Sequence, residues 1–301
     1  MAEAQMQQDT EAAPSVKIRS RRQDFVKAFF SNRLAMFGTL VMLVFVLLAV
    51  FAPLIAPYDP LDQNLPQKFA GPSLAHPFGQ DELGRDILSR VIYGARISLT
   101  AGLAAVAIAT GAGTLIGVVS GFFGSYTDSA LMRLMDVILA FPSILLAIMI
   151  VSVLGPSLVN AMLAIGVVYV PQLARVVRSA VISVRERDFI EAERALGAPN
   201  SQIIFSGVLP NCMAPLIVQA TLTLATAVLD VAALSFLGLG ARAPTPEWGA
   251  MLTDAFRSGF GVFVQGQHAI IFPGIAIALA VLSVNFVGDG LRDALDPRRR
   301  S

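Results

Sequence analysis

The sequence predicts an all-α membrane protein with six transmembrane helices. Charged residues make up only 14% of the 301 residues and hydrophobic residues 55%, whereas about a quarter of an average soluble domain is charged. Six apolar segments approach or exceed the roughly 20 residues that a helix needs to cross a bilayer. These segments are residues 34–56, 97–119, 135–154, 158–177, 213–237 and 269–288.

Residues 1–33 are expected to form a cytoplasmic tail. Its beginning, 1–15, is small, polar and rich in Gln, which is typical of disorder. The basic stretch 17–33 contains three phenylalanines, so it is either an amphipathic helix on the membrane surface or a flank that only sets topology. The first span, 34–56, begins too far from the N-terminus for a cleaved signal peptide and is interpreted as an anchor.

An extracytoplasmic loop, 57–96, is expected between the first two spans. From Asp81 onward its apolar residues follow helical spacing, which predicts a short amphipathic helix leading into the second span. This helix either forms part of a docking face or covers the bundle. The acidic residues of the loop are Asp59, Asp62, Asp81, Glu82 and Asp86.

Prolines and glycines inside the spans predict bends and close packing. Pro142 and Pro171 lie in the third and fourth spans, where proline removes a helix hydrogen bond and kinks the axis. Such bends suit pore-lining helices and ordinary packing equally well. Gly111, Gly113 and Gly117 of the second span suit close approach of a neighbouring helix.

Residues 185–211 form a charged segment between the fourth and fifth spans, and they predict an ordered helix–turn–helix. Asp188 with Glu191 three residues later matches a capping box at a helix start. Gly197 suits the left-handed position that ends a helix. Asn200 or Ser201 is expected to cap a second short helix, and Pro210 to lie in the first turn of the next span. An ordered loop of this kind predicts a protein partner.

The distribution of basic residues predicts the orientation. With the N-terminus in the cytoplasm, 16 of the 22 Lys and Arg residues fall in cytoplasmic segments, as the positive-inside rule requires. An even number of spans then places both termini in the cytoplasm, together with the loop 185–211 and the tail 289–301. The five spans within 97–288 are expected to form the core of the protein.

Asp230 is a carboxylate inside the fifth span. Burying it in lipid costs about 2.5–3.5 kcal/mol on insertion scales, so it is expected to face a cavity or a partner. It either lies on a translocation path, where it would attract a peptide amino terminus, or is a buried acid that positions helices. Tyr169, Gln172 and Gln219 are polar enough to line the same path.

Several function classes find no support in the sequence. The net charge of +1 argues against binding of nucleic acid. Cys212 is the single cysteine, so no intrachain disulfide forms. Motifs of zinc proteases and of phosphate-binding loops do not occur, and both histidines lie outside the spans. We therefore expect neither an enzyme nor a bound cofactor or metal.

The loop 185–211 resembles the EAA loop of permease subunits of bacterial binding-protein-dependent ABC importers. The resemblance covers about residues 20 to 300, and the stretches 76–99, 235–252 and 285–298 narrow it to the C-type permease of the dipeptide and oligopeptide group. Two positions depart from the pattern: Glu193 stands where alanine is usual, and Gly207 where histidine is frequent. The matching loop residues are Glu191, Ala192, Gly197, Ile204, Leu209 and Pro210.

The resemblance implies a type I ABC importer permease in the bacterial inner membrane. Such a subunit pairs with a second, homologous permease around a central path. Two separate ATPase subunits would hydrolyse ATP, and an extracytoplasmic solute-binding protein would deliver substrate. The matching loop residues would couple the ATPases to the spans, with Glu191 contacting an ATPase, capping its own helix, or both.

The resemblance implies import of dipeptides or short oligopeptides, with nickel complexes or glutathione as the alternative. A stand-alone secondary transporter is disfavoured, because the spans hold few ionisable groups and show no inverted repeat. A non-transporting scaffold would leave the ordered loop and Asp230 without a role.

Overall fold

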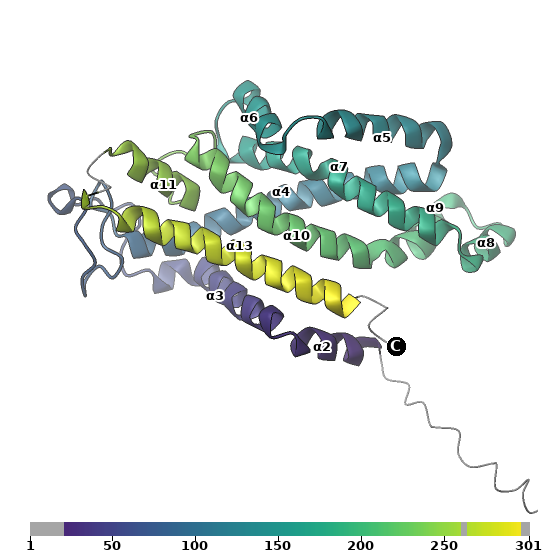
Figure 1. Cartoon of the computed structure of the whole chain (residues 1–301), viewed down its shortest axis with the longest axis horizontal. Helices are drawn as coiled ribbons and strands as arrows, with labels where there is room; N and C mark the ends of the chain where they lie inside the picture. Colours follow the sequence, from purple (N-terminus) through teal and green to yellow (C-terminus); the bar gives the residue numbers. More distant parts are fainter. Residues whose placement is uncertain (1–20, 260–263, 296–301) are drawn as a thin grey trace, which may run out of the picture.

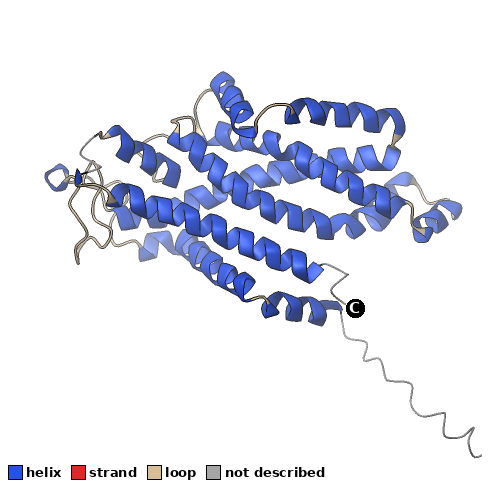
Figure 2. Cartoon of the chain, in the orientation of Figure 1, coloured by secondary structure: helices blue, strands red, loops and turns tan. Residues whose placement is uncertain are grey.

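The computed structural model describes residues 21–259 and 264–295, and these residues contain helices but no β-strand (Figure 2). The expected disorder of residues 1–15 lies outside the described residues. Long helices run side by side along the longest axis of the molecule, and α8 lies at the opposite end from the loop that follows α3 (Figure 1). The described ends of the chain, at the start of α2 and the end of α13, lie towards the α8 end.

Among the residues that the structure describes, five helices are long and apolar enough to cross a membrane, and a bent pair makes up a sixth candidate. The prediction of an all-helical protein with six spans is thus confirmed. The five helices are α3 (Arg33–Ile55), α4 (Ile87–Phe123), α7 (Leu158–Arg185), the helix Asn200–Phe236 and α13 (His268–Leu295).

The bent pair occupies the place of the third predicted span. α5 (Ser125–Leu139) and α6 (Ser143–Leu154) meet at 90°, so Pro142 marks a break rather than a kink. Proline disfavours the helical conformation of the residue before it, and its ring ends the i−4 hydrogen-bond ladder. Pro171, in contrast, lies inside α7 without interrupting it.

Two ion pairs join α5 to α7. Arg178 Nε and Nη2 lie 2.5 Å from the two carboxylate oxygens of Asp128, in a bidentate arrangement. Arg175 Nη2 lies 2.5 Å from Asp136 Oδ1. α5 is therefore held along α7 (Figure 1), and α6, after the sharp bend, packs against α7 through Ala147 and Val151.

The second span is longer than predicted. Helix α4 begins at Ile87, with the Asp86 carboxylate accepting a hydrogen bond from the Ser89 amide at 2.7 Å. The expectation of a separate helix from Asp81 is wrong, because residues 81–86 form a turn and the apolar residues after it belong to α4. Ile87 and Val91 pack in the core, so this face covers the bundle.

α4 packs closely along α7 through small residues four positions apart. A Cβ on Gly113 would lie 2.7 Å from Leu173 Cβ, and one on Gly117 would lie 2.6 Å from the Ala174 carbonyl oxygen. Close backbone approach of this kind is typical of membrane helices. Gly111 does not contribute, because nothing lies within 4 Å of a Cβ at that position.

The N-terminal helix α2 (Arg21–Ser31) precedes α3. Asn32 caps α3, since its side-chain oxygen accepts hydrogen bonds from the amides of Leu34 and Ala35. Its side-chain amide donates to Asp293 Oδ2 at 3.3 Å, which ties the start of α3 to the end of α13. A helix within 17–33 is therefore present, and its placement on a membrane surface stays a prediction.

Candidate coupling loop and translocation residues

Helix α8 (Asp188–Ala195) is the first element of the loop 185–211. The predicted capping box is wrong: Arg187 occupies the cap position, and no side chain caps the helix. The Arg187 carbonyl accepts the amides of Ile190 and Glu191, so Asp188 is already inside the first turn. Both acids still lie at the positive end of the helix dipole, which favours negative charge.

Gly197 ends α8 as predicted. Its φ of +81° is in the left-handed region, and a Cβ there would have no atom within 4 Å. The Gly197 amide donates to the Arg194 carbonyl at 2.9 Å, and the Ala198 amide donates to the Glu193 carbonyl at 3.1 Å. This pair of bonds is a Schellman motif. Glycine is thus required here by backbone conformation and not by lack of space.

The second helix of the loop is continuous with the fifth span. It runs through α9 (Asn200–Gln202), the π-helix η2 (Ile203–Val208) and α10 (Leu209–Phe236). The expectation that Asn200 or Ser201 caps it is wrong, because Pro199 holds the cap position and no side chain bonds there. Pro210 lies in the first turn of α10, as predicted. A displacement of α8 would therefore act on the fifth span without a flexible joint.

α8 is seated on the π-helix by its apolar face. Ile190 is fully buried and packs with Ile203 and Val208 of η2. Gly207 makes this seat possible, because a Cβ there would lie 2.7 Å from Ile190 Cδ1. The matching loop residues Glu191 and Ala192 point outward and are exposed. Within the described residues, the Glu191 carboxylate makes no hydrogen bond or ion pair, so it does not cap its own helix.

Three large apolar side chains are exposed on this loop, and the sequence reasoning did not single them out. Leu196 is 88% exposed, Phe205 71% and Phe189 40%. Large exposed apolar side chains that occur together on one ordered loop are candidates for a protein interaction site. The available signal was the occurrence of large apolar residues within a charged segment. We refer to Phe189, Leu196 and Phe205 as the loop patch.

Of the predicted path residues, the fold brings Tyr169 and Asp230 together. The Tyr169 hydroxyl donates to Asp230 Oδ2 at 2.6 Å, which links α7 to α10. Gln172 is exposed on α7. Gln219 lies three turns before Asp230 on the same helix, about 16 Å away at 1.5 Å per residue.

Gln219 instead lines a cavity of about 790 Å³ near the α8 end of the bundle. The cavity lies between α7, α10 and α13, and its basic residues are Arg187 and Arg292. The four predicted path residues therefore do not form one site in this structure.

A buried charge cluster lies at the other end of the molecule, and sequence reasoning missed it. Arg85 Nε lies 2.6 Å from Asp81 Oδ2, and a second Arg85 nitrogen contacts Glu82. Arg85 and Arg90 approach Asp254 of α11 (Trp248–Arg257) at 3.5 and 3.8 Å. Burial, reinforced by the Asp81 carboxylate, raises the pKa of Glu82. The cluster fastens the loop 57–86 to α4 and α11.

Glu247 joins α11 to α4 beside this cluster. It is fully buried and caps α11, accepting the Ala250 amide at 2.9 Å and the Ser98 hydroxyl at 3.0 Å. Burial raises the pKa of its carboxyl group. Next to it, Trp248 is also fully buried, and its indole donates to the Val91 carbonyl at 3.0 Å. The stretches 76–99 and 235–252 thus meet in one structural unit.

No metal site is apparent in residues 21–259 and 264–295: no three His, Cys, Asp or Glu side chains there are placed to hold an ion. The chemistry available is ion pairing, hydrogen bonding and apolar packing.

This architecture defines a class, the membrane-spanning permease of ABC transporters. The structure is similar to the MetNI methionine ABC transporter in inward facing conformations, with a TM-score of 0.56 and 20% identity. The similarity covers 70% of this chain and 98% of that chain. The likeness shows that the two chains share a fold.

The chain belongs to the family of binding-protein-dependent transport system inner membrane components. The sequence profile of that family matches residues 113–301, and the profile of the N-terminal TM domain of oligopeptide transport permease C matches residues 20–72. The resemblance drawn from the sequence is thereby confirmed. The chain is an inner-membrane permease subunit of an ABC importer, and such subunits are not enzymes.

Its relatives carry transport names. The dipeptide transport system permease protein DppC of Alkalihalophilus pseudofirmus is 50% identical, over 91% of this chain and 89% of that protein. The di/tripeptide transport system permease protein DppC of Pseudomonas aeruginosa is 46% identical over 96% of both. The glutathione transport system permease protein GsiD of Escherichia coli is 42% identical over 95% of both.

Proposed function

We propose that this chain forms half of the translocation path of an importer for dipeptides or short oligopeptides. The peptide class is supported by the 46% and 50% identity to relatives named for di/tripeptide or dipeptide transport. Glutathione is the second candidate, because a relative named for its transport is 42% identical over 95% of both chains. Glutathione is itself a short peptide derivative, so the two proposals differ in specificity rather than in mechanism.

The partners we propose are a second, homologous permease, two ATPase subunits and an extracytoplasmic solute-binding protein. One observation carries the coupling part of this proposal: the loop patch is apolar and exposed, on helices that are firmly seated and joined by an ordered turn. Leu196 and Phe205 are the most exposed of the three. ATP hydrolysis would take place in the ATPases, whose movement would push α8 and, through the continuous helix Asn200–Phe236, the fifth span.

We further propose that both termini and the loop 185–211 face the cytoplasm. The positive-inside bias supports this orientation, as does the position of α8 at the end of the bundle towards which the described chain ends lie (Figure 1). Single cysteines at Ser73 and Ser201, in a Cys212→Ser background, would be labelled with an impermeant maleimide in intact cells. Labelling only of the cysteine at position 73 is expected. Labelling only of the cysteine at position 201 would show that the orientation is the opposite of the one proposed.

The coupling proposal is tested on the full complex reconstituted in vesicles. Leu196→Asp and Phe205→Asp place a charge where an ATPase groove is expected, so both should release the ATPases and abolish uptake. Ser206→Asp is the matched control, since Ser206 is an exposed polar neighbour of Phe205. Full retention of the ATPases by both loop-patch variants would exclude the loop patch as their binding surface.

Substrate choice is tested with the cognate solute-binding protein. A dipeptide and glutathione compete in a binding measurement, and uptake of each is then followed in vesicles. Tighter binding and faster uptake of the dipeptide are expected. A preference for glutathione in both measurements would favour the second candidate.

A further inference from the structure

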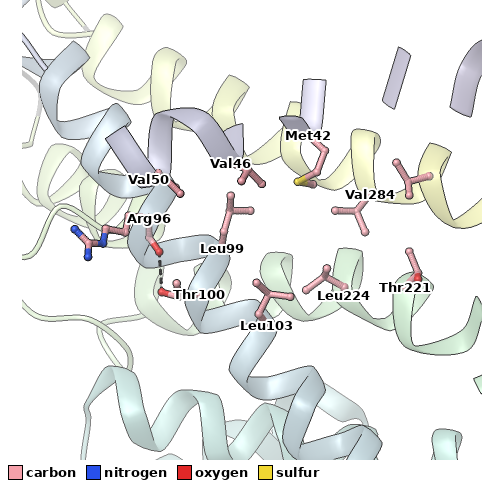
Figure 3. A pocket seen from close by; sticks show the side chains of 12 residues that line it. Met42, Val46, Val50, Arg96, Leu99, Thr100, Leu103, Thr221, Leu224 and Val284 are labelled. Atoms are coloured by element: carbon pink, nitrogen blue, oxygen red, sulfur yellow. Dashed lines mark hydrogen bonds between the residues drawn. The ribbon is translucent and has the colours of Figure 1, made fainter. Parts of the chain in front are cut away.

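An apolar groove of about 400 Å³ lies between α3, α4, α10 and α13 (Figure 3). Its lining consists of aliphatic and Met side chains, two threonines and one arginine, Arg96. The threonine hydroxyls are already satisfied, because Thr100 donates to the Arg96 carbonyl at 2.7 Å and Thr221 to the Ile217 carbonyl at 2.8 Å. The threonine hydroxyls in the groove therefore have no free proton to donate to a polar solute.

Arg96 stands at one end of this groove. Its side chain is exposed, and within the described residues its guanidinium has no ion-pair or hydrogen-bond partner. Figure 3 shows the guanidinium directed away from the apolar lining. Side chains of a helix lean towards its N-terminus, so this direction leads to the Ile87 end of α4, where the extracytoplasmic loop lies. A single unpaired cation thus borders an apolar groove.

We propose that the groove binds one acyl chain of an anionic phospholipid whose phosphate pairs with Arg96. A guanidinium binds phosphate in a bidentate manner and is the preferred residue for this task. A zwitterionic headgroup would bring an ammonium group next to Arg96, and the lining contains no acid to receive it. This complementarity of charge favours a headgroup with net negative charge.

The shape and lining of the groove fit a lipid chain. The lining runs from Arg96 to Leu103 on α4, about 10 Å at 1.5 Å per residue. Part of an extended acyl chain can lie along this apolar stretch. Exposed apolar side chains such as Val50 and Leu103 border the opening, as is expected of a surface that faces lipid.

The test uses the complete chain in phosphatidylcholine vesicles that contain a minor fraction of phosphatidylglycerol with a photoreactive group on its acyl chain. We expect crosslinks to Met42, Val46 and Leu103. In parallel vesicles, labelled phosphatidylcholine should react about fivefold less, the factor that one basic residue contributes near an anionic surface. Equal labelling by the two lipids would overturn the proposal.

Two variants separate the headgroup from the chain. Arg96→Gln should reduce the phosphatidylglycerol signal to the phosphatidylcholine level, whereas Arg133→Gln, an exposed arginine of α5, should leave it unchanged. Val46→Phe fills the groove and should remove the crosslinks although Arg96 is retained. An unchanged signal in Arg96→Gln would overturn the proposal. Loss of crosslinks on assembly with the second permease would also overturn it, because a protein segment would then be the occupant.

Discussion

The carboxylate of Glu193 lies over Gly207, with Oε2 3.0 Å from the position that a Cβ on residue 207 would take. These are the two positions at which the loop departs from the EAA pattern. They are separated in sequence by the turn at Gly197 but adjacent where α8 meets the π-helix η2. Glu193 Oε2 is buried and has no hydrogen-bond partner. The glutamate at position 193 is larger than the usual alanine, and its carboxylate lies where a side chain at position 207 would begin. The two departures from the EAA pattern are therefore structurally linked.

The first prediction tests this link. Gly207→Val inserts a side chain against Ile190 and Glu193, and overpacking of this kind costs about 1–3 kcal/mol. We expect α8 to lose its seat and the ATPases to dissociate more readily. Adding Glu193→Ala removes one of the two obstructing groups and should restore part of the binding. A double-mutant cycle on ATPase retention measures the effect, and strict additivity would mean that the two side chains do not interact.

The second prediction concerns the turn after α8. Gly197→Val forces a β-branched residue into the left-handed region, where even an ordinary L-residue costs about 1–2 kcal/mol. The Schellman motif should open, so that ATP hydrolysis continues while uptake falls. Membrane insertion should be intact.

The control for this variant is Gly155→Val, in the connection between α6 and α7. Gly155 has a φ of +90° and, like Gly197, no atom within 4 Å of a Cβ. Its ψ of 147° lies near a region that is almost exclusive to glycine, so a valine there carries at least as much backbone strain, away from the loop 185–211. We expect coupling to be retained in Gly155→Val. Normal uptake by Gly197→Val would show that this turn is not needed for coupling.

The third prediction separates the two interpretations of Asp230. Asp230→Asn keeps a hydrogen-bond acceptor for Tyr169 but removes the charge, whereas Tyr169→Phe removes the hydrogen bond and keeps the acid. If Asp230 attracts a peptide amino terminus, Asp230→Asn reduces uptake without preventing assembly, and it does so more than Tyr169→Phe. Unchanged uptake by Asp230→Asn, measured over a range of peptide concentrations, would support the purely structural role.

The fourth prediction concerns pH and Glu247. The folded protein raises the pKa of this carboxyl above its ordinary value of 4.5 through burial, so protonation favours the folded state. This contribution to stability is complete below the ordinary pKa and is lost as the pH rises through the raised pKa. Glu247→Gln keeps an oxygen that accepts the Ala250 amide and carries no charge. Thermal unfolding in detergent should then depend less on pH than in the wild type.

A control for the pH experiment is Asp62→Asn, because Asp62 is an exposed acid of the loop 57–86. It should leave the pH dependence of unfolding unchanged. If thermal unfolding of Glu247→Gln depends on pH as strongly as that of the wild type, burial of the Glu247 carboxyl is not the source of this pH dependence. Glu82, whose pKa is raised as well, would be the next group to replace.

The fifth prediction concerns the buried charge cluster. Arg85 is 1% exposed and pairs with both Asp81 and Glu82. Breaking a buried ion pair from one side leaves an uncompensated charge and costs about 3–5 kcal/mol. Arg85→Met should therefore loosen the loop that precedes α4, measured as faster proteolysis within 57–86. The triple variant that also carries Asp81→Asn and Glu82→Gln should recover part of the protection from proteolysis. Equal proteolysis rates in the wild type and both variants would mean that the cluster does not hold the loop.

The sequence by itself determined the properties that depend on local pattern. Hydropathy identified all six apolar segments, and the positive φ at Gly197 followed from the need of a helix end for a left-handed residue. The residues of the EAA loop identified the family without any coordinates. Helix starts were less well predicted, because Asp188 and Asn200 have the composition of caps but the backbone begins each helix one residue earlier.

Only the tertiary structure decided which distant side chains meet. Tyr169 and Asp230 are distant in sequence and bond because α7 packs beside α10. Glu193 reaches Gly207 because α8 folds back on the π-helix, and Arg85 reaches Asp254 because α11 lies against the loop 57–86. Periodicity shows which residues share a helix face but carries no information about the neighbour that this face meets. The packing of all helices together determines that neighbour. The sequence of one segment does not contain this information.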